Sequence, residues 1–442
     1  MPVYNIKIKH STTVTKSVYR WCLDSPVNDF AVSDERVGQI GIKVRGWVLP
    51  NPKKNLSVVV LCGDEVISLP FNEERPDVIQ KVLKESPSDH TLLRCGFRHS
   101  VRFKHPNFSI GVIESANFHP LLMGSIEGSL KVLEGKDNWL FLDNDSNQSV
   151  EQYTGKLKIS RSEKLKWKSY FKSILKLSTS QDIPSCMLIA PSKENVYSQY
   201  YPFTEADVTP IKQLQKIIPQ SFPHVYPAES LKAMSDRSYR LCDTHWTLHG
   251  ARESSILLAK KLIGNEEGLR EIFCNDLYDA KESFGDLGRK VYPPSSAKED
   301  ILRNYNYRDN VLFDNNLPNF GRIILMHNES ALKDSTLLFF GSSSAYSMFH
   351  FISRMFRTIV FVHTAGNVDP KLIEETNPDY FCMQTNARFV VKSPTANESV
   401  KQYIESKKET MNKSNIDQCI VAKTIPPSRA DLVSYLMQLS QS

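Results

Sequence analysis

The chain has 442 residues, of which 40% are hydrophobic and 24% charged, and its formal net charge is +6 at pH 7. These proportions exclude a disordered chain, and no dense basic block indicates nucleic-acid binding. At about 100–200 residues per domain, the length predicts two or three domains. No apolar run approaches the roughly 20 residues that span a bilayer, and the first ten residues lack the apolar core of a secretory signal. We therefore expect a cytoplasmic protein.

The first part of the chain has the pattern of a β-rich domain. Short apolar runs cover residues 44–49, 57–62 and 65–69, and Gly63-Asp64 separates the last two as a two-residue hairpin turn. Further strand signals follow in the same region. We expect a small β-sandwich over residues 1–125.

From about residue 130, strands and helices alternate. Strand-like runs cover residues 186–190, 336–340, 358–362 and 380–383, and helical patterns cover 162–177, 251–263, 345–356 and 369–376. This rhythm is typical of an α/β fold with a parallel sheet flanked by helices. We expect one such domain over residues 126–442, with a helical C-terminal tail. Residues 264–320 have weaker periodicity and are interpreted as an insertion or a long loop.

The segment Asp243-Thr244-His245-Trp246 pairs a carboxylate with an imidazole two residues apart. On a helix these two side chains would point roughly 200° apart, whereas in a turning segment they can point the same way. There the carboxylate can orient the imidazole as a general base. The pair precedes a predicted helix, on a connecting loop where functional sites tend to lie. An Asp-x-His pair by itself is common, and a purely structural role is the alternative.

The second segment is Gly341-Ser342-Ser343-Ser344, between an apolar strand and a helix. A turn at the carboxyl end of a parallel strand exposes a serine hydroxyl beside the N–H groups of a helix start, which can form an oxyanion hole. The alternative is that one serine is only a helix N-cap. Together the two segments supply a nucleophile, a base and an orienting acid.

Residues 130–390 resemble the SGNH-like O-acetyltransferases of bacterial polysaccharide modification, the alginate acetylation group. The specific landmarks are the Asp243-Thr244-His245-Trp246 segment and the downstream Gly341-Ser342-Ser343 turn. Supporting landmarks are residues 135–141 (GKDNWLF), 191–197 (PSKENVY), Gly250, and residues 377–388, in which Gln384 stands where the family usually has an acid.

The resemblance implies an SGNH-hydrolase-like fold in which Ser343 is the nucleophile, His245 the base and Asp243 its orienting acid. It also makes Ser344, Tyr346, Arg388 and Trp246 candidates for contacts with the substrate or the oxyanion. Because the turn reads Gly-Ser-Ser, Ser342 or Ser344 remains an alternative nucleophile.

The N-terminal part resembles a small β-sandwich found beside bacterial glycosyltransferases and capsule enzymes. The likeness lies in residues 45–49 (RGWVL), 75–78 (RPDV) and 96–97 (GF), and it implies an accessory role such as carbohydrate binding. Trp47 and Phe97 fit a core role equally well.

The resemblance implies an O-acetyltransferase that moves an acetyl group from acetyl-CoA, through an acyl-enzyme, to a hydroxyl of a bacterial capsular or exopolysaccharide or its precursor. A capsule-synthesis complex is a further expected partner, and nucleic acid is not. Because no metal-ligand spacing is visible, we expect no metal, and we expect no permanently bound cofactor. The alternatives are a glycan acetyl esterase, which needs the same triad, and a non-catalytic glycan-binding scaffold.

Overall fold

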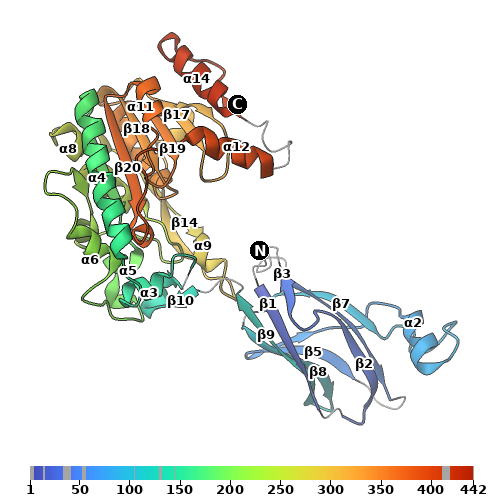
Figure 1. Cartoon of the computed structure of the whole chain (residues 1–442). Helices are drawn as coiled ribbons and strands as arrows, with labels where there is room; N and C mark the ends of the chain where they lie inside the picture. The colour runs from blue at the N-terminus through green and yellow to red at the C-terminus, as the bar shows by residue number, and fades with distance from the viewer. Residues whose placement is uncertain are drawn as a thin grey trace. The chain divides into compact units, whose positions relative to one another are not determined.

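The computed structural model describes residues 4–12, 15–32, 41–51, 56–103, 105–128, 132–143, 145–410 and 419–441 (Figure 1). Its contacts divide the chain into two compact units. The first unit comprises Met1–Val132 and Phe284–Ser296, and the second comprises Leu133–Ser283 and Ala297–Ser442. The division into domains at residues 125 and 126 stays a prediction. No helix among the described residues combines the length and apolar character needed to cross a membrane.

The first unit is built from two antiparallel sheets that share one core. One sheet has the order β3-β1-β9-β8-β5-β6 and the other β2-β4-β7. Their strands are β1 (Tyr4–His10), β2 (Val18–Ser25), β3 (Phe30–Val32), β4 (Ile42–Pro50), β5 (Ser57–Cys62), β6 (Glu65–Ser68), β7 (Gly96–Val101), β8 (Asn107–Glu114) and β9 (Asn117–Gly128). The predicted hairpin turn joins β5 and β6, and Gly63 adopts a positive φ of 60° there. Trp47 and Phe97 are both buried in this unit.

A segment distant in sequence completes the core of the first unit. Within residues 284–296, which include the short helix α9 (Gly285–Gly288), the Tyr292 hydroxyl accepts a hydrogen bond from the backbone N–H of Phe103 at 3.0 Å. The Tyr292 ring packs edge-on against Tyr4, with 5.2 Å between the ring centroids. Part of the region that we expected to be an insertion therefore contributes core packing.

The second unit is mixed α/β around an eight-stranded sheet of order β13-β12-β20-β18-β19-β17-β16-β21. The strands are β12 (Ser185–Ala190), β13 (His224–Val225), β16 (Val311–Asp314), β17 (Ile323–His327), β18 (Lys333–Gly341), β19 (Phe356–His363), β20 (Tyr380–Asn386) and β21 (Ile420–Val421). The first five in sheet order run parallel. The last three pair antiparallel, so the sheet is mixed rather than wholly parallel.

Helices cover both faces of this sheet, because alternate side chains of its strands point into two separate cores. In β18, Leu337 and Phe339 face one core, while Leu338 and Phe340 face the other. The first core also takes side chains of α8 (Leu248–Ile263) and α10 (Ala345–Met355). The second takes side chains of α4 (Arg161–Gln181), α6 (Pro210–Gln215), α11 (Pro370–Thr376), α12 (Val400–Thr410) and α14 (Ala430–Gln441) (Figure 1).

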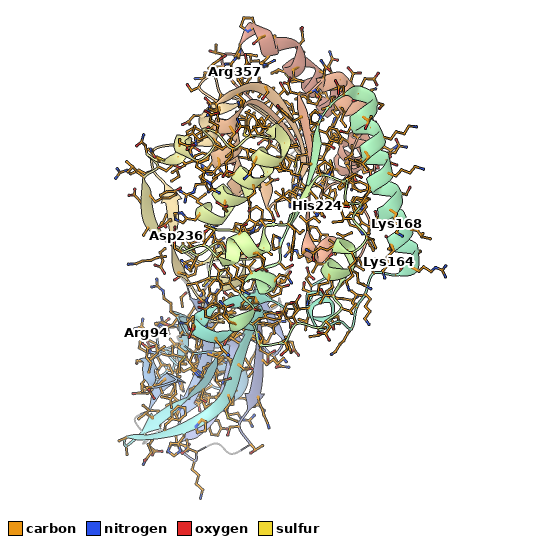
Figure 2. All side chains as sticks on the ribbon, turned by 90° about the vertical axis from the view of Figure 1, so that its left-hand side faces the viewer. Arg94, Lys164, Lys168, His224, Asp236 and Arg357 are labelled. Carbon is orange, nitrogen blue, oxygen red and sulfur yellow. The ribbon has the colours of Figure 1, made fainter. Side chains whose placement is uncertain are left out.

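The sequence explains why α4 forms and which face it buries. The Ser160 side chain caps its start by accepting the Glu163 N–H at 3.2 Å. Four large residues at helical spacing, Trp167, Tyr170, Phe171 and Ile174, are buried against the sheet. Lys168 lies on the exposed outer face of the helix (Figure 2).

Candidate active site

The site forms where three parallel strands end at the same edge of the sheet. Ala190, the last residue of β12, lies opposite Asn386, the last residue of β20. The neighbouring strand β18 ends at Gly341, directly before the three serines. The carboxyl ends of parallel strands are where open α/β sheets bind their ligands. Segments far apart in sequence therefore meet at this edge.

The segment with Asp243 and His245 forms the tip of a short hairpin-like loop. Tyr239 bridges Trp246 in antiparallel fashion, and the backbone N–H of Arg240 donates to the His245 carbonyl at 3.2 Å. The loop leads directly into α8, whose N-cap is Thr247. The pair is thus in a turning segment, where both side chains can point the same way.

Gly250 fixes the distance between α8 and this loop. A Cβ atom at Gly250 would lie only 2.2 Å from the backbone oxygen of Ser238. Only a glycine allows this close approach. The glycine therefore lets the start of α8 pack directly against the backbone of Ser238.

Lys193 ties the loop to the neighbouring strand ends. It begins α5 (Lys193–Val196), directly after β12, and it is buried. Its ammonium group donates to the backbone carbonyls of Leu140 at 2.6 Å, Leu241 at 2.8 Å and Asp243 at 3.1 Å. The ammonium also lies 5.0 Å from the centre of the Trp139 ring. These contacts hold the backbone of the loop in place.

Asp243, His245 and Ser343 form one hydrogen-bonded line. His245 Nδ1 lies 2.7 Å from Asp243 Oδ1, and the same oxygen accepts the backbone N–H of His245 at 2.8 Å. The opposite ring nitrogen, Nε2, lies 3.2 Å from Ser343 Oγ. With Nδ1 donating to the carboxylate, Nε2 presents its lone pair to the serine hydroxyl. This is the arrangement in which a histidine can remove a serine proton.

Asp243 remains ionised in this line. Its side chain is buried, with 6% of the residue exposed, and burial alone would raise the pKa of the carboxyl group. The hydrogen bonds and charge of His245, with a smaller contribution from Arg240, outweigh burial and hold this pKa below its usual range. A permanent negative charge therefore faces His245 Nδ1.

The three consecutive serines have different partners. The Ser342 hydroxyl is buried and donates to Gln384 Oε1 at 2.9 Å, and the Ser344 hydroxyl donates to Asn386 Oδ1 at 3.0 Å. Ser343, between them, is the one that contacts His245. The geometry thus favours Ser343 over the two alternatives that the sequence left open.

Asn386 is a candidate functional residue that our sequence analysis missed. Its Oδ1 accepts from Ser344 Oγ and from Gln384 Nε2, the latter at 2.9 Å. Within the described ranges no acceptor binds its Nδ2, and the residue lines the pocket beside His245. The amide is therefore oriented so that its N–H groups are available to a ligand. Its position three residues after the predicted strand 380–383 was the signal that the sequence offered.

The structure places the other predicted residues in different surroundings. Trp246 is buried and donates its indole N–H to the Tyr239 hydroxyl, so it forms part of the pocket wall and of the core. Tyr346 is not among the residues that line this pocket, and its hydroxyl lies 3.1 Å from His363 Nδ1. Arg388 and Ser344 do line it.

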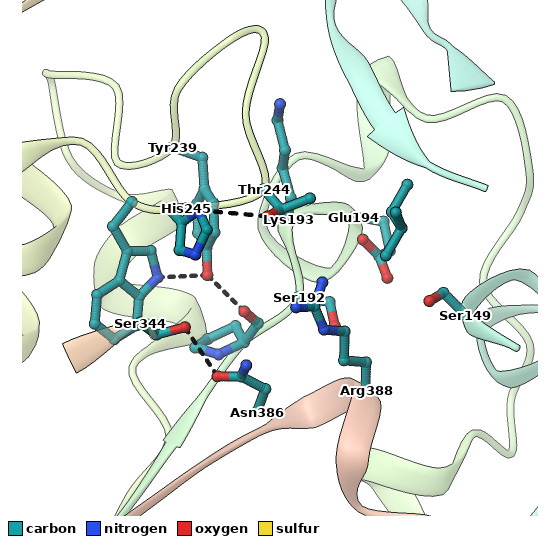
Figure 3. Close-up of a pocket in the computed structure, with 13 residues that line it drawn as sticks. Ser149, Ser192, Lys193, Glu194, Tyr239, Thr244, His245, Ser344, Asn386 and Arg388 are labelled. Carbon is teal, nitrogen blue, oxygen red and sulfur yellow. Dashed lines mark hydrogen bonds between the residues drawn. The ribbon is translucent and has the colours of Figure 1, made fainter. Parts of the chain in front are cut away.

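A pocket with a cavity volume of about 30 Å³ lies beside His245; it is partly open to solvent, and both polar and apolar groups line it (Figure 3). The loop contributes Thr244, His245 and Trp246, and the strand ends contribute Ser192, Lys193, Glu194, Ser344, Asn386 and Arg388. Glu194 and Ser192 are further lining residues that the sequence analysis did not single out.

Comparisons with known proteins find distant structural likenesses. PatB1 from Bacillus cereus is similar over 60% of this chain and 97% of its own, at 13% identity and a TM-score of 0.45. The O-acetyltransferase domain of Pseudomonas putida AlgJ is similar over 65% and 97%, at 15% identity and a TM-score of 0.36. AlgX from Pseudomonas aeruginosa is similar over 61% and 68%, at 12% identity and a TM-score of 0.35.

No protein-family model matches the chain, and neither does any curated protein. Since each of these three TM-scores lies below 0.5, the functional argument rests on the geometry of the site.

Proposed function

We propose that this protein is an O-acyltransferase, most simply an O-acetyltransferase, that uses Ser343 as its nucleophile. The hydrogen-bonded line from Asp243 through His245 to Ser343 carries this proposal. Its geometry matches what a serine needs in order to lose its proton to a histidine during attack on an acyl group.

In the first half of the reaction, Ser343 Oγ bonds to the carbonyl carbon of the acyl donor while its proton passes to His245 Nε2. The donor's bond to its leaving group breaks, and His245 returns the proton to that group. In the second half, His245 takes the proton of a sugar hydroxyl, the sugar oxygen bonds to the acyl carbon, and the ester bond to Ser343 Oγ breaks. His245 then reprotonates Ser343.

The negative charge that develops on the acyl oxygen needs hydrogen-bond donors. The backbone N–H of Ser343 and the Asn386 side-chain amide are our candidates for this oxyanion hole. In comparable sites the loss of one such donor slows the reaction by about 10²–10³-fold.

The donor, acceptor and location are part of the same proposal. We infer acetyl-CoA as the donor, a capsular or exopolysaccharide or its precursor as the acceptor, and the cytoplasm or the surface of the inner membrane as the location. An SGNH-like fold for the second unit and a carbohydrate-binding role for the first belong to this proposal as well.

The decisive experiment is the mass of the intact protein after incubation with p-nitrophenyl acetate and, separately, with acetyl-CoA. The wild type is expected to gain one acetyl group, and Ser343→Ala is expected to gain none. Ser347→Ala is the matched control, because it removes a nearby hydroxyl that neither contacts His245 nor lines the pocket; it should still be acetylated. An adduct on Ser343→Ala that is equal to the wild-type adduct would overturn the proposal.

Adding sugars to the acetylated protein separates the remaining alternatives. Transfer of the acetyl group to a sugar supports the transferase, whereas loss to water at a rate that no acceptor changes supports an acetyl esterase. A wild type that binds glycans but never becomes acetylated supports the non-catalytic scaffold.

A further inference from the structure

A buried acidic side chain lies in the pocket without a partner from another residue. Glu194 is 9% exposed and lines the pocket together with His245. Within the described part of the chain, its carboxyl group receives a hydrogen bond from its own backbone N–H, and no ion pair of Glu194 within 4 Å is found. Burial raises the pKa of this carboxyl group, although its own N–H and the charges of Arg388 and Lys193 act in the opposite direction. A buried carboxyl group normally has more partners than this.

A guanidinium group in the same pocket also lacks a partner. Arg388 lines the pocket, and its Nε is buried with no hydrogen-bond acceptor among the described residues. The group instead lies 5.2 Å from the centre of the Phe389 ring. Arg388 acts electrostatically on Glu194, so the two groups are near each other, but no ion pair joins them. Figure 3 shows both side chains in the pocket with His245.

The two unpartnered groups restrict the chemistry of a ligand between them. A phosphate or carboxylate would suit Arg388 but would add a second acidic group beside Glu194 at a buried position. An ammonium group would suit Glu194 but would face the Arg388 charge. Like-charge contacts of this kind are unfavourable at a desolvated site. A hydroxyl group suits both, because it donates to the carboxyl group and accepts from the guanidinium.

We propose that Glu194 and Arg388 form the acceptor subsite of this pocket and bind neighbouring hydroxyls of an uncharged sugar residue. This proposal rests on the proposed function, because it names the residue type that receives the acyl group from Ser343. Glu194 and Arg388 act as specificity-determining residues: they hold the sugar ring while a further hydroxyl of that ring faces His245. The subsite excludes a uronate at this position.

The test starts from protein acetylated with p-nitrophenyl acetate and measures how the acetyl group is partitioned between a sugar and water. The acceptors are the methyl α-glycosides of glucose, mannose and galactose, with methyl α-glucuronide as the acidic counterpart. Wild-type protein should transfer to at least one neutral glycoside in preference to the glucuronide. Glu194→Gln should lower the ratio of transfer to hydrolysis about tenfold or more, because it replaces one carboxyl oxygen, an acceptor for the sugar hydroxyl, with an amide N–H₂ group that can only donate.

Two further variants separate a loss of sugar binding from a general effect of mutating this unit. Arg388→Gln should lower the same ratio of transfer to hydrolysis, because it removes the guanidinium that donates to the neighbouring hydroxyl of the sugar. Glu271→Gln, at an exposed position in the same unit, is the matched control and should keep the wild-type ratio. If wild-type protein forms no Ser343 adduct, the proposed function fails. If the adduct forms but Glu194→Gln keeps the wild-type ratio, or the glucuronide is the better acceptor, the subsite is wrong and the proposed function stands.

Discussion

The hydroxyl of Ser343 has a different partner from the hydroxyls of its two neighbouring serines. Ser342 and Ser344 donate their hydroxyl protons to side chains of β20, whereas Ser343 reaches His245. In the turn after β18, the three serine side chains point toward three different partners. Which of the three serine hydroxyls contacts His245 therefore depends on the backbone of the turn, and the residue type alone does not specify it.

Asp243 gives a prediction at the same scale. Asp243→Asn keeps the shape of the side chain but removes the charge that faces His245 Nδ1. In comparable triads this change lowers kcat by about 10⁴-fold. We expect a similar fall in the rate of p-nitrophenol release, measured at neutral pH.

The pH dependence of stability tests the charge of Asp243 separately. Because the folded state holds the pKa of Asp243 below its usual range, the carboxylate stabilises the fold above the unfolded pKa of about 4. That contribution is lost as the pH falls through the folded pKa. Urea denaturation at pH 6, 4 and 3 should therefore show the wild type losing more stability on acidification than Asp243→Asn. Equal losses would mean that the charge of Asp243 does not stabilise the fold.

At the scale of elements, the buried ammonium group of Lys193 joins α5 to the 239–246 loop. Lys193 donates to three backbone carbonyls, and two of the residues it contacts, Leu140 and Leu241, also share a backbone hydrogen bond. The sequence analysis singled out no catalytic role for this lysine, and its contacts are those of a positioning residue.

Replacing Lys193 tests this connection. Lys193→Met keeps the length of the side chain but removes three hydrogen bonds from a charged, buried donor, so we expect a loss on the order of 3 kcal/mol in the free energy of unfolding. Because the loop then shifts, acylation of Ser343 should slow by tenfold or more, in line with the roughly 10²-fold cost of a 1 Å misplacement. Urea denaturation and p-nitrophenol release measure the two effects. Lys168→Met on the outer face of α4 is the control, and equal behaviour of both variants would contradict the role.

At the scale of the whole molecule, the first unit is assembled from two separate stretches of the chain. Residues 284–296 lie between the two stretches of sequence that form the second unit, but they contribute Tyr292 to the core of the first unit. The first unit is therefore incomplete without a segment from the second half of the chain.

Tyr292→Phe measures how much that segment contributes. Removing the hydroxyl leaves the buried N–H of Phe103 without an acceptor, which costs about 1–3 kcal/mol. We expect the loss in the denaturation of the full-length chain. Tyr19→Phe, where the ring is 54% exposed, should cost almost nothing. A Tyr292→Phe variant as stable as Tyr19→Phe would show that this hydrogen bond does not stabilise the first unit.

Local sequence patterns predicted most of the α/β elements, because hydrophobic spacing and caps act within one element. Helix α4 and strands β12, β18, β19 and β20 lie where the patterns placed them. Strands β16 and β17 were not predicted, and they pair antiparallel at one side of the sheet. Which strands become neighbours depends on packing between distant segments, and a local pattern does not contain that information.

The sequence by itself determined the chemistry available to this protein: an acid, an imidazole and a serine in segments that turn, and a glycine where α8 approaches the backbone. Only the tertiary structure decided which serine meets the imidazole, that Asn386 presents its amide, and that Glu194 and Arg388 share a pocket without pairing. Residues more than 40 positions apart meet at one sheet edge, because parallel strands bring their carboxyl ends together. The type of each residue sets what it can do, and the register of β12, β18 and β20 sets which residues act together.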